Sequence, residues 1–329
     1  MDNGYHSLDM IMVPISIYDE IEIEKNDFDV VECEGMKLPE NNTVSKMIQV
    51  LKDTYHLDSC FKVSIKKHIP AQAGLGGGSA DAAAVCKAVL KMEGIEETEE
   101  NLYEITKQVG ADVPFCIHDK WARVKGIGEK ITPIESDWKF DIVVVKPDFG
   151  ISTANAFSKW KESRPFHPDV DLVESSIREE NMDLLYQTMA NSLEPIAFEI
   201  EPELEQVKMD MEDAGLVRIL MSGSGSSMLG FSVDEEVILS ACEQLKEKYN
   251  FCSNCSCGEA NMAASVISYL VFFACFGLSF YAISSIQFEK VCSVKNPKKV
   301  QILMFLLSLC LAYISSQAIL QLTIYNGFA

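Results

Sequence analysis

The residue types best suited to chemistry stand in a glycine-rich run, Ile69-Pro70-Ala71-Gln72-Ala73-Gly74-Leu75-Gly76-Gly77-Gly78-Ser79-Ala80-Asp81-Ala82-Ala83. Glycines allow backbone N–H groups to approach and surround phosphate oxygens. The alanine-rich stretch that follows is a strong helix former, and the positive end of its dipole would face the same anion. The run therefore predicts a phosphate-binding loop between a strand and a helix, although a plain flexible turn is the alternative.

Two common phosphate-binding motifs do not fit this run. A Walker A loop ends in Gly-Lys-Ser/Thr, and a dinucleotide fingerprint has glycine at the position of Ser79. The glycine-rich run is therefore an anion-binding loop of another class. A second small-residue loop, Ser222 to Ser227, follows a predicted strand.

Asp112 is the acidic residue with the clearest chemical context, in Gly110-Ala111-Asp112-Val113-Pro114-Phe115. A positioned carboxylate can accept a proton from an attacking hydroxyl. An Asp before Val-Pro is by itself more often a turn residue. Ser79 and Asp81 could reach Mg²⁺ or a phosphate, but helix capping explains either residue equally well.

The glycine-rich run resembles the phosphate-binding motif of the GHMP kinases, Pro-x-x-x-Gly-Leu-Gly-(Gly/Ser)-Ser-(Ser/Ala), and Ser222 to Ser227 resembles their third motif. Within these kinases, Asn3-Gly4-Tyr5-His6 and the Asp112 motif resemble the diphosphocytidyl-methylerythritol kinase family. Asn3 replaces the usual Asp, and Ala71-Gln72 is an uncommon pair. The resemblance runs from Met1 to about Tyr249.

The resemblance implies an ATP-dependent kinase of the non-mevalonate isoprenoid pathway that phosphorylates the 2-hydroxyl of a cytidylyl sugar alcohol with Mg²⁺. It implies that Asp112 is the catalytic base, that Tyr5 and Phe157 stack on the cytosine, and that His6 and Thr153 also bind substrate. The residues that it implies for ATP binding are Pro70, Ala71, Gln72, Ala73, Gly74, Leu75, Gly76, Gly77, Gly78, Ser79, Ala80, Gly223, Ser224 and Gly225. A helical Phe157 is equally often plain core. Another GHMP small-molecule kinase and a catalytically weak nucleotide-binding module are the rival functions.

The order of predicted elements mixes strands and helices without a regular βαβ repeat, which indicates an α+β fold in two layers. Strands are expected on both sides of Tyr18-Asp19 and over Phe61–Ile69 and Lys139–Val145. Helices are expected over Asn42–Tyr55, with Val44, Met47, Ile48 and Leu51 on the buried face, and over Glu235–Tyr249. The resemblance refines this to a ribosomal-protein-like N-terminal domain over 1–145 and an α/β C-terminal domain over 146–250.

The net charge of −21 argues against a nucleic-acid partner, because no basic patch is present to displace counterions from a phosphate backbone. Eleven scattered cysteines without a signal peptide indicate a reducing, cytoplasmic compartment. Cys252, Cys255 and Cys257 lack a fourth ligand at recognisable spacing, so we expect no metal there.

The C-terminal part differs from the acidic body. After an expected linker at 251–262, Ala263–Ile286 has 24 residues without a charge and Val300–Leu322 has 23. Each run is long enough to cross a membrane, so two transmembrane helices are expected over 263–329, with a pair of apolar core helices as the alternative. This tail resembles a small uncharacterised family of two-helix bacterial membrane proteins.

The lysines between the two runs, Lys290, Lys295, Lys298 and Lys299, place that loop in the cytoplasm and both tail ends outside. A kinase needs cytoplasmic ATP, so we expect two neighbouring genes joined near Asn250 to Met262. The family also normally begins earlier, with a strand that carries a Lys-x-Asn pair near the reacting phosphate. Here the first lysine is Lys25, so an upstream start is expected and the chain as written should be poorly active.

Overall fold

The computed structural model describes residues 7–160 and 167–258, and in the C-terminal part residues 275–276, 279–280, 283, 305–311 and 313–315. The chain divides into two units, Met1–Ala260 and Asn261–Ala329. The division predicted near residue 145 lies inside the first unit.

The elements of the first unit are β1 (Leu8–Met12), β2 (Glu20–Asn26), β3 (Val30–Cys33), α1 (Thr43–Tyr55), β4 (Cys60–Lys66), α2 (Gly77–Glu93), α3 (Glu99–Thr106), α4 (Val113–His118), β5 (Ala122–Gly126), β6 (Lys130–Pro133), β7 (Phe140–Lys146), α5 (Thr153–Trp160), α6 (Val170–Arg178), α7 (Met182–Thr188), α8 (Glu194–Ile200), α9 (Glu203–Asp213), β8 (Arg218–Met221), β9 (Met228–Phe231), α10 (Glu235–Lys246) and β10 (Phe251–Cys257).

The described strands of the first unit form three sheets, with the orders β1-β5-β6, β2-β4-β3 and β10-β7-β9-β8. All pairs are antiparallel except β3 with β4. The strands expected on either side of Tyr18-Asp19 are present, but they do not pair with each other, because β1 pairs with β5 and β2 pairs with β4. The mixture of helices with mainly antiparallel sheets agrees with the expected α+β class.

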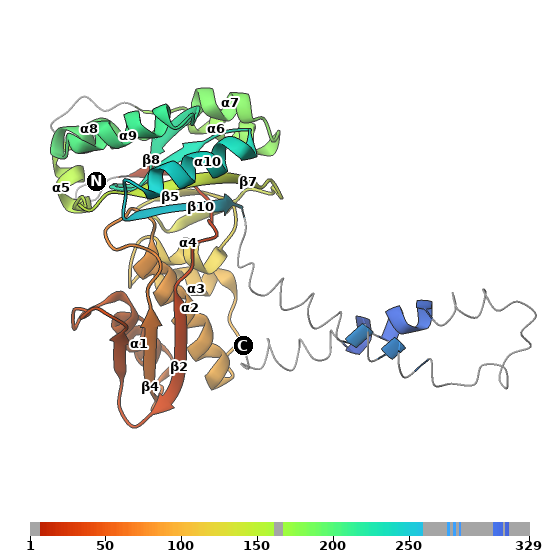
Figure 1. Ribbon diagram of the computed structural model, residues 1–329. Coiled ribbons are helices and arrows are strands. Elements are labelled where there is room, and N and C mark those ends of the chain that lie inside the picture. The colour runs from red at the N-terminus through yellow and green to blue at the C-terminus, as the bar shows by residue number, and fades with distance from the viewer. Residues whose placement is uncertain are drawn as a thin grey trace, which may run out of the picture. The chain divides into compact units, whose positions relative to one another are not determined.

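One hydrophobic core lies between α1, α2, α4 and β4, which Figure 1 shows side by side. The predicted buried face of α1 is confirmed, because Val44, Met47, Ile48 and Leu51 are each at most 2% exposed. Asn42 caps the helix by accepting a hydrogen bond from the Ser45 N–H, which fixes where α1 begins. The 3.6-residue period of apolar side chains thus positions α1 beside α2.

The second core surrounds β7, which is buried on both faces. Val143 and Val145 pack with α8, α9 and α10, whereas Ile142 and Val144 pack with α7 and β10. Figure 1 shows α10 alongside β7 and β10. A strand that is buried on both faces has a nearly continuous apolar sequence, as predicted for Lys139–Val145.

The linker predicted at 251–262 is wrong in its first part, because residues 251–257 form β10. β10 pairs along its whole length with β7, from Phe251 opposite Lys146 to Cys257 opposite Phe140. Cys255 and Cys257 are buried at the edge of the second core. Pairing with β7, and not local sequence preference, makes this Cys- and Ser-rich segment a strand.

Most of the two expected transmembrane segments lies outside the described residues. Among the residues that are described, no helix is long and apolar enough to cross a membrane. The two-helix membrane tail therefore stays a prediction.

Candidate active site

The predicted phosphate-binding loop connects β4 to α2, as expected from the sequence. The backbone takes positive φ angles at Gln72, Gly74 and Gly76, of 52°, 70° and 67°. α2 begins at Gly77, before the alanine-rich run Ala80–Leu90 that predicted the helix, so Ser79 lies in the first helical turn. No side chain caps this helix start, and the helix dipole favours an anion at such an end.

The second glycine loop lies directly against the first. The Ser222 hydroxyl donates to the Gly74 carbonyl oxygen at 2.8 Å, and the Ser227 N–H donates to the Ala73 carbonyl at 3.1 Å. A Cβ atom on Gly74 would stand 2.3 Å from the Ser222 carbonyl oxygen. Only glycine fits at position 74, because the two backbones approach so closely there.

Asn191 also holds the second loop. Its side-chain amide donates to the carbonyls of Met221 and Gly223, both at 2.8 Å. The Ser226 hydroxyl donates to the Phe149 carbonyl at 2.5 Å, and the same carbonyl accepts from the buried Lys146 ammonium at 2.8 Å. Sequence reasoning missed Asn191 and Lys146, since a lone Asn or Lys carries no local pattern.

Thr153, at the start of α5, comes together with the predicted nucleotide loop. Its hydroxyl lies 2.7 Å from the hydroxyl of Ser224. Phe157 stands one turn further along α5 and is partly buried against the second core. Tyr5 and His6 lie outside the described residues, so stacking by Tyr5 and Phe157 stays a prediction.

Asp112 stands at the N-cap position of α4, but its side chain makes no capping hydrogen bond. Burial raises the pKa of the Asp112 carboxyl above its ordinary value. A Cβ atom on Gly110 would lie 4.0 Å from the Ser79 hydroxyl, so the acidic motif reaches the first turn of α2. The backbone of the acidic motif thus adjoins the first turn of α2, and the Asp112 carboxylate is not used as a helix cap.

A turn that the sequence analysis did not single out supports the acidic motif. Gly128, between β5 and β6, has a φ angle of 119°, and a Cβ atom there would stand 2.5 Å from the Ala111 carbonyl oxygen. Glu129 closes the turn by accepting the Ile127 N–H at 2.7 Å. The sequence Gly126-Ile127-Gly128-Glu129 could have indicated this turn, because two nearby glycines suggest a close approach of two backbone segments.

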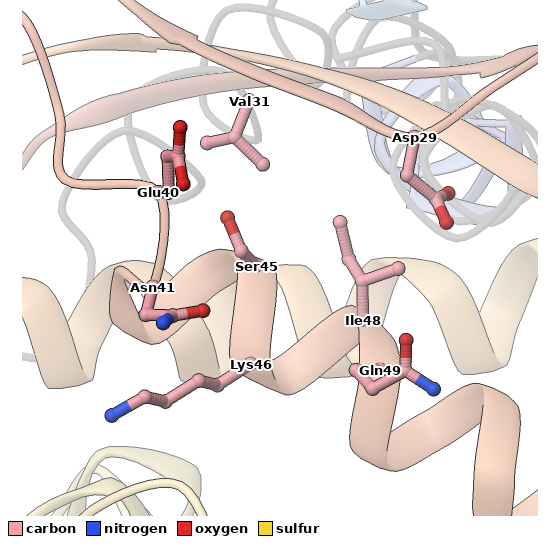
Figure 2. A pocket seen from close by; sticks show the side chains of 8 residues that line it. All are labelled: Asp29, Val31, Glu40, Asn41, Ser45, Lys46, Ile48 and Gln49. Atoms are coloured by element: carbon pink, nitrogen blue, oxygen red, sulfur yellow. The ribbon is translucent and has the colours of Figure 1, made fainter.

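A pocket of about 400 Å³ opens beside α1. Figure 2 shows Ser45 and Ile48 pointing from α1 toward Val31, with Asp29 further along the strand segment. The pocket adjoins the N-terminus of α1, where the Thr43 hydroxyl donates to the Gly78 carbonyl at 2.7 Å. Its lining contains no predicted site residue and consists of Asp29, Val31, Glu40, Asn41, Ser45, Lys46, Ile48 and Gln49.

The cysteines of β10 do not gather around one point. Cys255 and Cys257 belong to the core beside α7, whereas Cys252 packs on the other face, with its sulfur 3.8 Å from that of Cys242. In the part of the chain that the structure describes, no three His, Cys, Asp or Glu side chains are grouped so that they could hold a metal ion.

Family models match both halves of the first unit. The model described as GHMP kinases N terminal domain matches residues 42–120, and GHMP kinases C terminal matches residues 173–250. Residues 273–320 match a third model, Protein of unknown function (DUF1146). This third match lies in the predicted membrane tail.

Relatives and solved structures agree with these matches. The 4-diphosphocytidyl-2-C-methyl-D-erythritol kinase of Clostridium botulinum (strain Hall) is 37% identical over 251 residues, which cover 75% of this chain and 90% of that protein. The kinase of the same name from Acetivibrio thermocellus is 39% identical over 248 residues, 74% of this chain and 88% of that protein.

A crystal structure of 4-(cytidine 5'-diphospho)-2C-methyl-D-erythritol kinase matches with a TM-score of 0.67 at 27% identity, covering 79% of this chain and 93% of that one. Mevalonate kinase of L. major matches with a TM-score of 0.59 at 17% identity, covering 76% and 90%, and shares the fold. The two glycine loops, the acidic motif and these relatives lead to one conclusion. The chain belongs to the 4-diphosphocytidyl-2-C-methyl-D-erythritol kinase family of GHMP kinases.

Proposed function

We propose that this chain transfers the γ-phosphoryl group of ATP to the 2-hydroxyl of 4-diphosphocytidyl-2-C-methyl-D-erythritol, a step of the non-mevalonate isoprenoid pathway. The observation that carries the proposal is the joining of the two glycine loops at Gly74 and Ser222. The acidic motif of Asp112 reaches the helix turn that follows the first loop. The names of the relatives supply the substrate.

The chemistry divides between the backbone and one side chain. The loop at Gly74 to Gly78 and the start of α2 would bind the phosphates through N–H groups and the helix dipole. Asp112 would take the proton of the substrate hydroxyl while that oxygen forms a bond to the γ-phosphorus and the bond to the β-phosphate oxygen breaks. The raised pKa of the Asp112 carboxyl makes it a stronger base than an exposed aspartate.

Substrate binding falls to four residues in this proposal. Tyr5 and Phe157 would stack on the cytosine, and His6 would contact its polar edge. Thr153 would contribute its hydroxyl beside the nucleotide loop, since it already lies 2.7 Å from the Ser224 hydroxyl. Phe157 is partly buried against the core, one helical turn beyond Thr153 on α5.

Mg²⁺ would enter with ATP. In kinase sites this ion is bound mainly by substrate phosphates and water, with one or two protein oxygens. Ser79 suits this arrangement, because its hydroxyl belongs to the first turn of α2, next to the proposed phosphate-binding loop. Bound there, Mg²⁺ would neutralise charge on the phosphates.

The test is a turnover assay of the purified protein with ATP and three alcohols: the cytidylyl substrate, homoserine and mevalonate. ADP release only with the cytidylyl substrate supports the proposal. Faster turnover with homoserine or mevalonate would assign the chain to another GHMP activity. Nucleotide binding without turnover of any alcohol would instead favour the nucleotide-binding module.

For the second unit we propose insertion in a membrane, with its lysine-containing loop in the cytoplasm; the kinase unit is then cytoplasmic only when it is made as a separate product. The support is the absence of charge over Ala263–Ile286 and Val300–Leu322. Carbonate extraction of membranes from cells that make the full chain tests this. A full-length chain that is released by carbonate would contradict insertion.

A further inference from the structure

Asp19, directly before β2, has a carboxylate that is only 3% exposed. One oxygen, Oδ1, accepts the backbone N–H groups of His68 and Ile69, at 2.6 and 2.8 Å. These two residues are the entry to the glycine-rich loop. A buried carboxylate that accepts two backbone N–H bonds fixes that stretch of backbone, because leaving the N–H groups unpaired would cost free energy.

The other oxygen of Asp19 binds the ammonium group of Lys67, the residue that follows β4. The same ammonium lies 2.9 Å from Oδ2 of Asp81, whose side chain is 6% exposed. Asp81 stands in α2, beyond the glycine-rich loop. Lys67 therefore ties the entry of the loop to its exit. We call Asp19, Lys67 and Asp81 the carboxylate bridge.

The carboxylate bridge lies next to the first turn of α2. A Cβ atom on Gly77 would stand 3.3 Å from the Lys67 nitrogen and 2.8 Å from a methyl carbon of Ile69. Between entry and exit the backbone takes left-handed angles at Gln72, Gly74 and Gly76. Glycine adopts such angles without strain, but Gln72 does not, so the surroundings of the loop have to hold this conformation.

The charges of the bridge suit a positioning role better than direct phosphate binding. Two carboxylates surround one ammonium, so the group as a whole is not positive. Burial raises the pKa of Asp81 to about 6, and its Oδ1 atom has no hydrogen-bond partner among the described residues. Removing Lys67 would leave two buried carboxylates without a cation, which is strongly destabilising.

We propose that the carboxylate bridge positions the glycine-rich loop for ATP, with Lys67 as the positioning residue that joins its two ends. This inference rests on the proposed role of that loop in ATP binding. It goes beyond that role because it proposes that a buried ion group outside the loop holds the phosphate-binding backbone in place. Lys67 acts on ATP through the backbone of the loop.

The variants follow from the geometry. Asp19→Asn keeps an Oδ1 that can accept the two backbone N–H groups, but it turns an amide donor toward the Lys67 ammonium, so it breaks only the ion pair. Lys67→Met breaks both ion pairs, and Lys67→Arg restores the charge. Lys66→Met is the matched control, because Lys66 pairs at 2.8 Å with Glu20 and both side chains are at least half exposed.

Binding of the non-hydrolysable analogue AMP-PNP is measured first, by the thermal shift it causes and by its Kd. Unmodified protein that does not bind it would overturn the proposed function and not the bridge alone. We expect Kd for AMP-PNP and KM for ATP to rise about 10-fold in Lys67→Met and several-fold in Asp19→Asn. Lys67→Arg should recover part of the loss, and Lys66→Met should change neither value.

Two results would overturn the proposal. A lower melting temperature with an unchanged Kd for AMP-PNP would reduce the bridge to a purely structural ion group. A fall in kcat with unchanged KM for ATP would mean that Lys67 contacts the transferred phosphoryl group directly. Asp19→Asn keeps the proposal testable if Lys67→Met does not fold, since it retains the two backbone contacts.

Discussion

The hydroxyl of Thr153 lies 2.7 Å from the hydroxyl of Ser224, across 71 residues of sequence. One residue was predicted to bind the sugar-alcohol substrate and the other to bind ATP. The contact joins α5 to the second glycine loop, so the two proposed binding regions share a hydrogen bond.

This contact predicts that Thr153→Val and Ser224→Ala have effects that do not add. Each change alone should lower kcat/KM by about 5-fold, because a neutral hydrogen bond contributes roughly 1 kcal/mol. The double variant should lose little more than either single one, as expected for residues in direct contact. Steady-state kinetics of the four proteins give the coupling, and Thr153→Ser is the control that keeps the hydroxyl. Fully additive losses would mean that the two hydroxyls act separately.

For Asp112→Asn we expect kcat to fall by about 10²-fold or more, with the Kd for AMP-PNP unchanged, since a positioned base is removed and the phosphate loops remain. In the unmodified enzyme kcat should fall on acidification through the raised pKa of Asp112, because the base must be ionised. Rapid-quench and pH-rate measurements check both. Normal turnover in the variant would remove Asp112 from the mechanism.

The same residue predicts a pH-dependent gain in stability. Burial raises the pKa of the Asp112 carboxyl in the folded protein, so ionising this carboxyl lowers the free energy of unfolding. The loss is absent below the ordinary pKa of about 3.9, grows as the pH rises above it, and is complete above the folded-state pKa. Asp112→Asn should therefore melt at a higher temperature than the unmodified protein at neutral pH. The difference should vanish as the pH falls toward 4. A constant difference across this range would contradict the assignment of the raised pKa.

Gly74→Ala and Gly94→Ala form a matched pair, with φ angles of 70° and 67°. An added Cβ meets nothing within 4 Å at Gly94, but would stand 2.3 Å from the Ser222 carbonyl at Gly74. Gly94→Ala should cost about 1 kcal/mol for the left-handed backbone alone. Gly74→Ala should cost about 2 kcal/mol more and also raise KM for ATP. Urea unfolding and kinetics separate these effects, and equal costs would mean that the two loops do not touch.

The pairing of β10 with β7 indicates that the kinase unit extends through residue 257. A chain of residues 1–260 should be soluble and fold cooperatively, whereas a chain of residues 1–250 lacks β10 and leaves one edge of β7 open along its length, with only β9 on the other edge. An open edge of this kind favours aggregation, and Ile142 and Val144 would lose part of their cover. Light scattering and calorimetry of the two chains make the comparison. Equal stability would show that β10 is dispensable.

The parts of the fold that the sequence predicted are those with local causes. The buried face of α1 follows from the spacing of Val44, Met47, Ile48 and Leu51, and the first glycine loop follows from backbone angles that favour glycine. The α+β class and the strand over 139–145 follow in the same way from period and apolar content.

The parts that it could not predict depend on distant partners. β10 is a strand only because β7 lies beside it, and its Cys- and Ser-rich sequence has little strand preference of its own. The carboxylate bridge joins Lys67 to residues 48 and 14 positions away, and no local spacing indicates such a pairing. Asn191 reaches the second loop across 30 and 32 residues. Sequence patterns thus located the two glycine loops, but the residues that hold these loops in place could be identified only from the tertiary contacts.

The contact between Gly74 and Ser222 spans 148 residues, which has a consequence for the newly made chain. While the ribosome is still adding α6 to α9, the glycine-rich loop has left the exit tunnel without the segment that supports it. Domains fold as units during synthesis, and contacts of such separation form late. A nascent chain released before β8 would therefore display the most recognisable motif of the protein and yet lack its ATP site. Affinity for nucleotide should thus appear abruptly, as the last third of the chain emerges.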